Sequence, residues 1–142
     1  MTQENKELLL KDLCARLPYG VKIRVNDNIE TVEGINILDN IVEFGTYMTC
    51  DIDEVKPYVF PMSSMTDEML EELNTNGFFK YRDTIANVSH LESNGKVSEE
   101  IYTYIDIENI SFLMEFFYSH HIDFRGLIEK GLAIDATGLS IY

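Results

Sequence analysis

The side chains most able to do chemistry gather in the segment HHIDFRGLIEKG, residues 120–131. Adjacent histidines could bind a metal ion or transfer protons, but neighbours on a helix point about 100° apart. His120 and His121 are therefore poorly placed to chelate one ion, and the H-E-x-x-H spacing of helical zinc sites is absent. We predict a helix end at which histidine interacts with the helix dipole. Metal binding or acid–base catalysis is the alternative.

Arg125 and Gly126 follow Asp123 in the same segment. An arginine beside a glycine predicts a turn with a structural salt bridge, and an arginine that holds an anionic ligand is the alternative. The glycines of GLIEKG do not continue as G-x-x-x-x-G-K-[ST], so the sequence predicts no phosphate loop.

Other polar motifs also have simpler structural uses. The run DIDE at 51–54 starts like a calcium loop, but Val55 and Lys56 break the pattern, and Met62 stands where a glutamate ligand is required. Ser64 lies before an acidic helix without a G-x-S-x-G elbow, so we predict a helix cap. We therefore predict no catalytic residue, no metal ligand and no bound cofactor, and expect that the protein is not an enzyme.

The chain is strongly acidic, with a formal net charge of −14 over 142 residues. The segment through Val25 is slightly basic, so the excess of carboxylates lies in the rest. Because an acidic surface repels phosphates, direct nucleic-acid binding is not expected. A basic protein surface, or plain solvation of the carboxylates, explains the charge.

Cysteine content and hydropathy bear on where the protein is found. Cys14 and Cys50 are too few and too far apart for a disulfide scaffold, and suit buried thiols in a reducing compartment. The apolar run LLL at 8–10 is followed at once by charged residues, unlike a secretion signal. No apolar run approaches the roughly 20 residues that span a bilayer. We expect a cytoplasmic protein with no membrane association.

The first part of the chain, residues 1–53, predicts a helix followed by a three-stranded meander. The helix, NKELLLKDLCARLPYG, ends before Pro18, and Lys11, Asp12 and Arg16 lie off its apolar stripe of Leu9, Leu10, Leu13, Cys14 and Leu17. Alternation predicts strands at 21–25 and 29–37, the second with a bulge near Val32 and Gly34. A third strand runs from Val42 to Asp53. Its predicted inner side holds Val42, Phe44, Met48, Cys50 and Ile52.

The remaining elements complete an α+β prediction. We expect a helix at 64–76 capped by Ser64, a hairpin at 84–105 around SNG, a helix at 108–121 and a turn-rich tail at 122–142 with one short strand near 132–134. A long helix from Ser98 is the alternative to the second hairpin arm. The stripe of the 108–121 helix is Ile110, Leu113, Met114, Phe117 and His121. The predicted fold is a single domain, residues 1–142, with an antiparallel sheet of three to five strands and about three helices on one face.

Three blocks carry a family resemblance: LLLKDLCARLPYGV at 8–21, VKPYVFPMSSMT at 55–66 and HHIDFRGLIEKGLAID at 120–135. Together they resemble an uncharacterised family of short proteins found in gut-anaerobe bacterial genomes, prophages and phages. The segment at 74–110 has no counterpart in this resemblance. The resemblance implies a cytoplasmic, mobile-element setting, and it brings no functional residue with it.

Three functions follow from these observations. The first is a non-catalytic, phage-type protein that binds a protein partner. Its predicted surface is Tyr47, Asp51, Asp53, Asp67, Glu68, Glu71 and Glu72. The second is an acidic nucleic-acid mimic that inhibits a host defence enzyme, and the third is a small metal-dependent enzyme using His90, His120 or His121.

Overall fold

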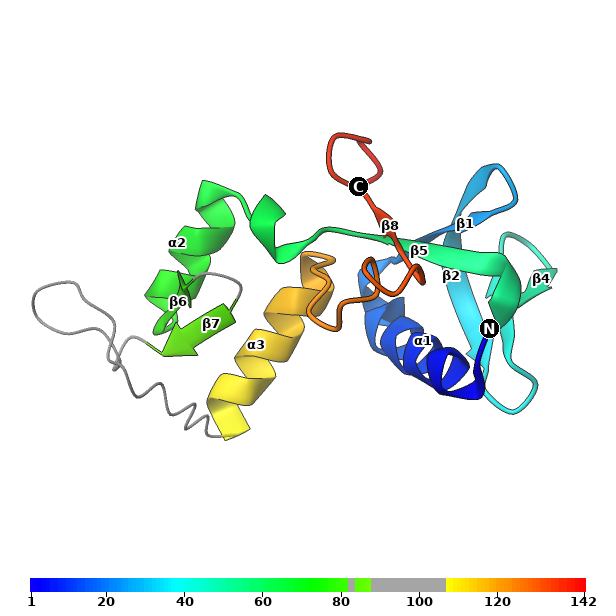
Figure 1. Ribbon diagram of the computed structural model, residues 1–142, viewed down its shortest axis with the longest axis horizontal. Coiled ribbons are helices and arrows are strands. Elements are labelled where there is room, and N and C mark those ends of the chain that lie inside the picture. The colour runs from blue at the N-terminus through cyan, green and yellow to red at the C-terminus, as the bar shows by residue number, and fades with distance from the viewer. Residues whose placement is uncertain (82–83, 88–106) are drawn as a thin grey trace, which may run out of the picture. The chain divides into compact units, whose positions relative to one another are not determined.

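The structure is a computed structural model that describes residues 1–81, 84–87 and 107–142 (Figure 1). The chain divides into two compact units: the first is Met1–Pro61 with Glu115–Tyr142, and the second is Met62–Met114. Helices and strands occur in both, so the α+β class is confirmed. The prediction of one domain stays a prediction, because compactness alone does not establish what folds independently.

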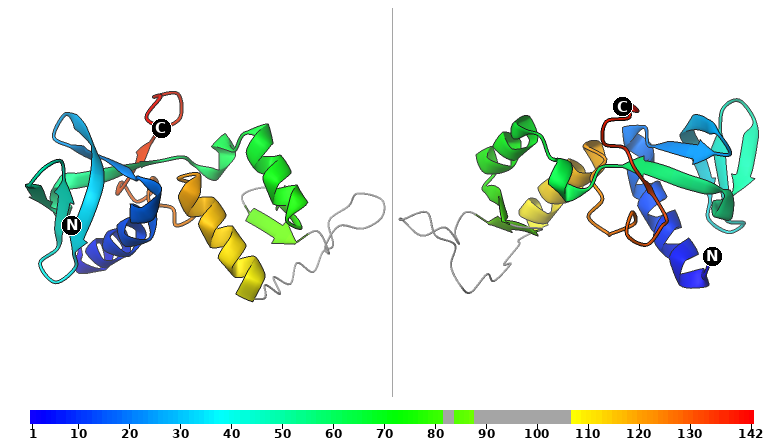
Figure 2. Two further views of the ribbon diagram at one scale, coloured as in Figure 1. Left: turned by 180° about the vertical axis from the view of Figure 1, so that it is seen from behind. Right: turned by 45° about the horizontal axis from the view of Figure 1, so that its top comes forward.

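The first unit is built on a six-stranded sheet in the order β4-β3-β2-β1-β5-β8. Its elements are α1 (Gln3–Arg16), η1 (Leu17–Tyr19), β1 (Lys22–Val25), β2 (Asn28–Asn36), β3 (Ile41–Phe44), β4 (Met48–Asp51), η2 (Ile52–Glu54), β5 (Val55–Val59) and β8 (Ile134–Asp135). Figure 2 shows α1 against this sheet from two further directions. The sheet is larger than the predicted three to five strands.

Helix α1 begins and ends as local chemistry dictates. The Thr2 side chain accepts a hydrogen bond from the Asn5 N–H at 3.2 Å and caps the first turn. The chain then tightens into η1 around Pro18, which cannot continue an α-helix, and Gly20 leaves it at φ 69°. Buried apolar residues of α1, β1, β2, β3, η2 and β5, with Val21 before β1, form one core: Leu9, Leu10, Leu13, Val21, Ile23, Val25, Val32, Val42, Phe44, Ile52 and Val55.

The predicted third strand is wrong, because the chain turns back within it. Gly45 and Tyr47 have φ values of 54° and 67°, a left-handed turn that separates β3 from β4. The predicted inner side is nonetheless confirmed, because Val42 pairs with Cys50 and Phe44 pairs with Met48, and ladder partners share a face. The Met48 side chain is still 56% exposed, since β4 is an edge strand among the described residues.

The bulge predicted in β2 is confirmed. Val32 pairs with Phe44 and Gly34 pairs with Glu43, so Glu33 is the extra residue on the bulged strand. A bulge of this kind bends the strand and increases its twist. Strand β2 thereby pairs with β1 at one end and β3 at the other.

The short strand predicted near 132–134 is confirmed in the C-terminal tail as β8, but the purely antiparallel prediction missed its parallel pairing. Strand β8 pairs with β5 in parallel, with Tyr58 opposite Ile134 and Val59 opposite Asp135. Beyond β5, Phe60 forms a parallel bridge to Ile122. A parallel partner needs a long connection, so a short tail strand gives no local signal of its pairing.

The second unit contains η3 (Met62–Ser64), α2 (Asp67–Thr75), β6 (Phe78–Tyr81) and β7 (Thr84–Asn87). Thr66, not Ser64, caps α2: its hydroxyl accepts from the Met69 N–H at 3.2 Å. The predicted helix at 64–76 therefore starts later, since Ser64 lies in the preceding 3₁₀ turn.

The hairpin that the structure describes joins β6 and β7. The predicted hairpin at 84–105 shares only its first four residues with β7, and its second arm and SNG turn lie outside the described residues. Residues buried in this unit include Leu73, Phe78, Ile85 and Ala86.

Helix α3 (Ile107–Ser119) matches the predicted helix at 108–121 closely. Its buried stripe differs, because Ile110 and Met114 are 43% and 36% exposed while Phe116 is buried. Three α-helices and three 3₁₀ turns occur among the described residues. None of the helices in that part of the chain has the length and apolar character to cross a membrane.

The core of the first unit can be tested with two leucines of opposite burial. Leu13 is 0% exposed and Leu38 is 94% exposed. Leu13→Ala should lower the free energy of unfolding by about 2–5 kcal/mol, because it leaves a cavity. Leu38→Ala should change it by less than about 0.5 kcal/mol. Urea denaturation followed by circular dichroism measures both, and equal losses would contradict the assigned core.

Candidate functional site

The first candidate site is the polar cluster around the adjacent histidines. His121 lies two residues after the last residue of α3, Ser119, in a left-handed conformation, φ 57°, and is 8% exposed. Its ring stacks on Tyr142 with 3.6 Å between centroids and 11° between planes. The Tyr142 hydroxyl donates to the Tyr58 carbonyl at 2.8 Å and accepts from the Lys22 N–H at 2.9 Å. This stack holds the chain terminus against β5.

Burial lowers the pKa of His121 to about 4, with smaller contributions from the charges of Arg16 and His120. The imidazole is therefore neutral near pH 7. The predicted interaction of a histidine with the helix dipole stays a prediction, and at His121 it would involve a neutral ring. Burial also raises the pKa of Tyr142 to about 12, so the stacked phenol is neutral as well.

The same polar cluster includes a buried ion pair between Asp12 and Arg16 of α1. Asp12 and Arg16, one turn apart on α1, are both 0% exposed, and Arg16 Nε donates to Asp12 Oδ2 at 2.7 Å. Arg16 Nη2 also donates to the Ile122 carbonyl at 2.7 Å. The second carboxylate oxygen of Asp12 accepts from Arg125 Nε at 3.2 Å. Placing Asp12 and Arg16 off the buried stripe was thus wrong: both lie in the interior.

The salt bridge predicted for Arg125 is confirmed, with Asp12 as its partner. Arg125 Nη2 also donates to the Tyr118 hydroxyl at 3.0 Å. Asp123 has a different use, because its two oxygens accept from the N–H groups of Leu127 and Ile128, both at 2.9 Å. The segment HHIDFRGLIEKG therefore attaches the tail to α1, and its polar groups contact the fold itself.

The geometry of this cluster gives little support for catalysis or metal binding. Arg16 Nη1 and His121 Nδ1 are the buried side-chain atoms without a hydrogen-bond partner in the described part of the chain. Neither lines the two recesses described below. Among the described residues, no three His, Cys, Asp or Glu side chains group to hold a metal ion. His90 lies outside those residues.

The thiols are not poised as nucleophiles. Both Cys14 and Cys50 are free and partly buried. Burial raises the pKa of Cys14. Burial, with Glu54 and Asp51 nearby, raises the pKa of Cys50 to about 11. The thiolate is the nucleophilic form, and a raised pKa keeps both groups mainly in the thiol form near pH 7.

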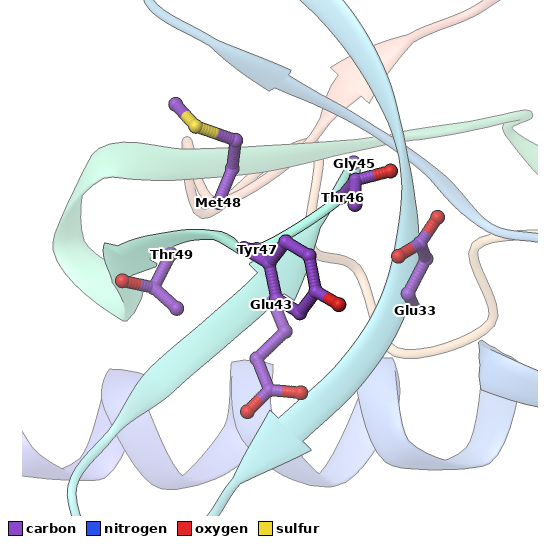
Figure 3. A pocket seen from close by; sticks show the side chains of 7 residues that line it. All are labelled: Glu33, Glu43, Gly45, Thr46, Tyr47, Met48 and Thr49. Carbon is purple, nitrogen blue, oxygen red and sulfur yellow. The ribbon is translucent and has the colours of Figure 1, made fainter.

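The second candidate site is the tip of the β3–β4 hairpin, which we call the hairpin surface (Figure 3). It surrounds a recess of about 550 Å³ lined by Glu33, Glu43, Gly45, Thr46, Tyr47, Met48 and Thr49. The Tyr47 side chain is 97% exposed. Gly45 and Met48 also line a smaller recess of about 170 Å³, with residues of β1 and β2.

The backbone around the hairpin explains how two carboxylates come close together on this surface. Because Glu33 is the bulged residue, it and Gly34 both lie opposite Glu43. A Cβ on Gly34 would lie 2.5 Å from Glu43 Oε2, so the missing side chain makes room for that carboxylate. Glu33 and Glu43 are exposed. The recess is therefore acidic as well as apolar.

The residues predicted to bind a partner fall in both units. Tyr47, Asp51 and Asp53 belong to the first, and Asp67, Glu68, Glu71 and Glu72 are exposed on α2 in the second. Asp53 pairs with Lys6 at 3.2 Å. Of the seven residues, Tyr47 alone lines the hairpin recess. Sequence patterns missed Glu33, Glu43 and Met48, although the predicted bulge was a signal for the first two.

The run DIDE forms a capping box. Asp51 Oδ1 accepts from the Asp53 N–H, and Glu54 Oε2 accepts from the Asp51 N–H, both at 3.0 Å. These carboxylates start η2 and have a structural use. The exclusion of a calcium loop at this position agrees with that geometry.

Comparison with known proteins gives no functional assignment: no family model, curated protein or solved structure matches the chain.

The buried ion pair predicts a large effect of a small change. Asp12→Asn should lower the free energy of unfolding by about 3–5 kcal/mol, because Arg16 and Arg125 lose their shared counter-charge in the interior. Asp53→Asn, which breaks the exposed pair with Lys6, should cost less than about 1 kcal/mol. Urea titrations of both variants measure the difference. Similar costs would contradict the structural role of the buried pair.

The lowered pKa of His121 predicts an acid-sensitive stability. The folded protein binds this proton with a pKa of about 4, against about 6.5 in the unfolded chain. The neutral His121 therefore contributes its full stabilisation of the folded protein above pH 6.5. As the pH falls towards 4, the free energy of unfolding decreases by up to roughly 3 kcal/mol.

His121→Asn is the test variant, since asparagine tolerates the left-handed backbone. The wild-type protein should lose more stability than this variant between pH 7 and pH 4 in urea titrations. His120→Asn is the control for loss of an imidazole. The prediction fails if the two variants show the same pH dependence.

Proposed function

We propose that the protein is a non-catalytic binding protein that presents the hairpin surface to a protein partner. The observation that carries this proposal is Tyr47, a bulky residue held at φ 67° with 97% of its side chain exposed. A left-handed conformation costs roughly 1–2 kcal/mol for a residue other than glycine. With so little of the side chain covered by other described residues, packing contributes little to offset that cost. Exposed aromatic side chains beside a pocket are typical binding hot spots.

The surroundings of Tyr47 support the same function. Met48 adds a flexible apolar side chain that is 56% exposed, and Thr46 and Thr49 add polar groups around the recess. A mixture of aromatic, methionine and polar residues is characteristic of protein interfaces. The reactive groups elsewhere, His121 and the thiols, are buried or neutral near pH 7. The balance of chemistry therefore favours binding over catalysis.

We place the protein in the cytoplasm, where the free thiols Cys14 and Cys50 stay reduced. The resemblance of its three sequence blocks to phage and prophage proteins suggests a host protein as the partner. The acidic chain, at −14, favours a partner whose surface is basic.

Tyr47→Gly separates binding from folding. Glycine adopts the left-handed turn without strain, so stability should stay the same or rise by about 1 kcal/mol. Capture of the partner from a lysate of the native host, quantified by mass spectrometry, should fall about tenfold or more.

Leu38→Ala is the matched control, because Leu38 is an equally exposed apolar residue in the turn before β3. It should leave both stability and capture unchanged. Capture by the Tyr47→Gly variant at the wild-type level would refute the hairpin surface as the binding site. Capture that instead disappears in moderate salt, whatever residue 47 is, would favour the acidic nucleic-acid mimic.

A further inference from the structure

Strand β4 offers backbone hydrogen bonds at the hairpin surface. It is an edge strand of the six-stranded sheet, and its described partner is β3. The Ile52 N–H donates to the Asn40 carbonyl at 2.9 Å, which makes these two a hydrogen-bonded pair. Since such pairs alternate along an antiparallel ladder, Cys50 also faces β3. Thr49 and Asp51 therefore direct their backbone groups away from β3.

Thr49 and Asp51 differ in whether their outward backbone groups already form hydrogen bonds. The N–H of Asp51 already donates to Glu54 Oε2 at 3.0 Å. This bond blocks the edge at the Asp51 end. Thr49, which is exposed and lines the recess, keeps its backbone N–H and carbonyl directed outwards. An added strand would thus pair at Thr49, next to Tyr47.

The side chains on the same sheet face as Thr49 favour a basic residue in an added strand. Thr49 is the ladder partner of Glu43, and Glu43 is opposite Glu33 and Gly34, so these side chains share one face. Strands lie about 4.8 Å apart. A residue paired with Thr49 would lie roughly 10 Å from Glu43, a gap that a long basic side chain and the glutamate bridge together.

A second copy of this chain fits poorly at the same edge. Two-fold pairing of β4 with β4 at Thr49 would join two acidic edges that carry Glu43, Asp51 and Glu54, and it would place a second Thr49, not a basic residue, next to the Glu43 face. Each chain also carries a net charge of −14. Like charges on facing strands are destabilising. Charge complementarity therefore favours a different, basic occupant.

We propose that an extended segment of the partner adds to β4 at Thr49 and places a lysine or arginine over Glu43 and Glu33. This inference rests on the proposed function and specifies the partner's chemistry. Main-chain hydrogen bonds at Thr49 supply affinity, and the two carboxylates supply selectivity. Tyr47 and Met48 pack against the apolar side chains of the added strand.

Synthetic peptides test the proposal without a known partner. The probe is a blocked peptide of about nine residues, with alternating threonine and valine and one central lysine. The control peptide has glutamate in place of the lysine. Titration followed by amide NMR resonances should show the largest shifts at Thr49 and its neighbours. The glutamate peptide should bind about tenfold more weakly or not at all.

Two variants isolate the backbone and the charge contributions. Thr49→Pro removes the outward N–H without breaking the β3 ladder, and should weaken binding of the lysine peptide about tenfold. Thr49→Ala keeps the N–H and should bind like the wild type. The double variant E33Q/E43Q should bring the two peptides within about twofold of each other. Circular dichroism checks that each variant is folded.

Three results would overturn the proposal: no shift at Thr49 with either peptide, equal affinity for both, or undiminished binding by Thr49→Pro. A concentration-dependent dimer in sedimentation that Thr49→Pro abolishes would overturn it in favour of a second copy. The proposed function fails differently. In that case Tyr47→Gly captures the host partner as well as the wild type does, whatever the peptides show.

Discussion

The fully buried ion pair of Asp12 and Arg16 is the interaction on which the first unit depends. Two charges removed from water cost several kcal/mol unless every lone pair and proton finds a partner. Helix α1 cannot supply those partners alone. Arg125 and the carbonyl of Ile122, from more than a hundred residues further along the chain, satisfy most of them. The tail is therefore a part of the interior rather than an appendage.

The tail's other contacts follow from that attachment. Arg16 holds Ile122, and Phe60, just after β5, bonds to the residues on both sides of it. The Phe60 N–H donates to the His121 carbonyl, and the Phe60 carbonyl accepts from the Asp123 N–H. Asp123 then orders the next turn by accepting from Leu127 and Ile128. These bonds position β8 against β5, so that β8 forms one edge of the sheet. Among the described strands, β4 forms the opposite edge.

The two candidate sites thus divide structure from binding. The histidine-rich segment looks reactive in the sequence, but His121 is buried and neutral near pH 7, and Asp123 and Arg125 are paired within the fold. The hairpin surface carries no reactive side chain, yet it combines a strained aromatic residue, an acidic recess and a backbone edge. The buried contacts of the first stabilise the fold, and under the proposed function the second contacts a partner. The proposed binding role agrees with this separation, because residues that hold the core cannot also be exposed.

Periodicity and composition alone determined the local elements: α1, the first two strands, the bulge in β2, the helix at α3 and the acidic surface. Each depends on neighbours in the sequence, such as Pro18 ending a helix or Asn26 turning a strand. Tertiary structure alone decided the rest. Whether Asp12 is exposed or buried depends on Arg125, and whether β4 is an edge depends on where β8 pairs. Neither partner lies within a local pattern, so the interior ion pair and the open hairpin surface emerge only from the folded chain.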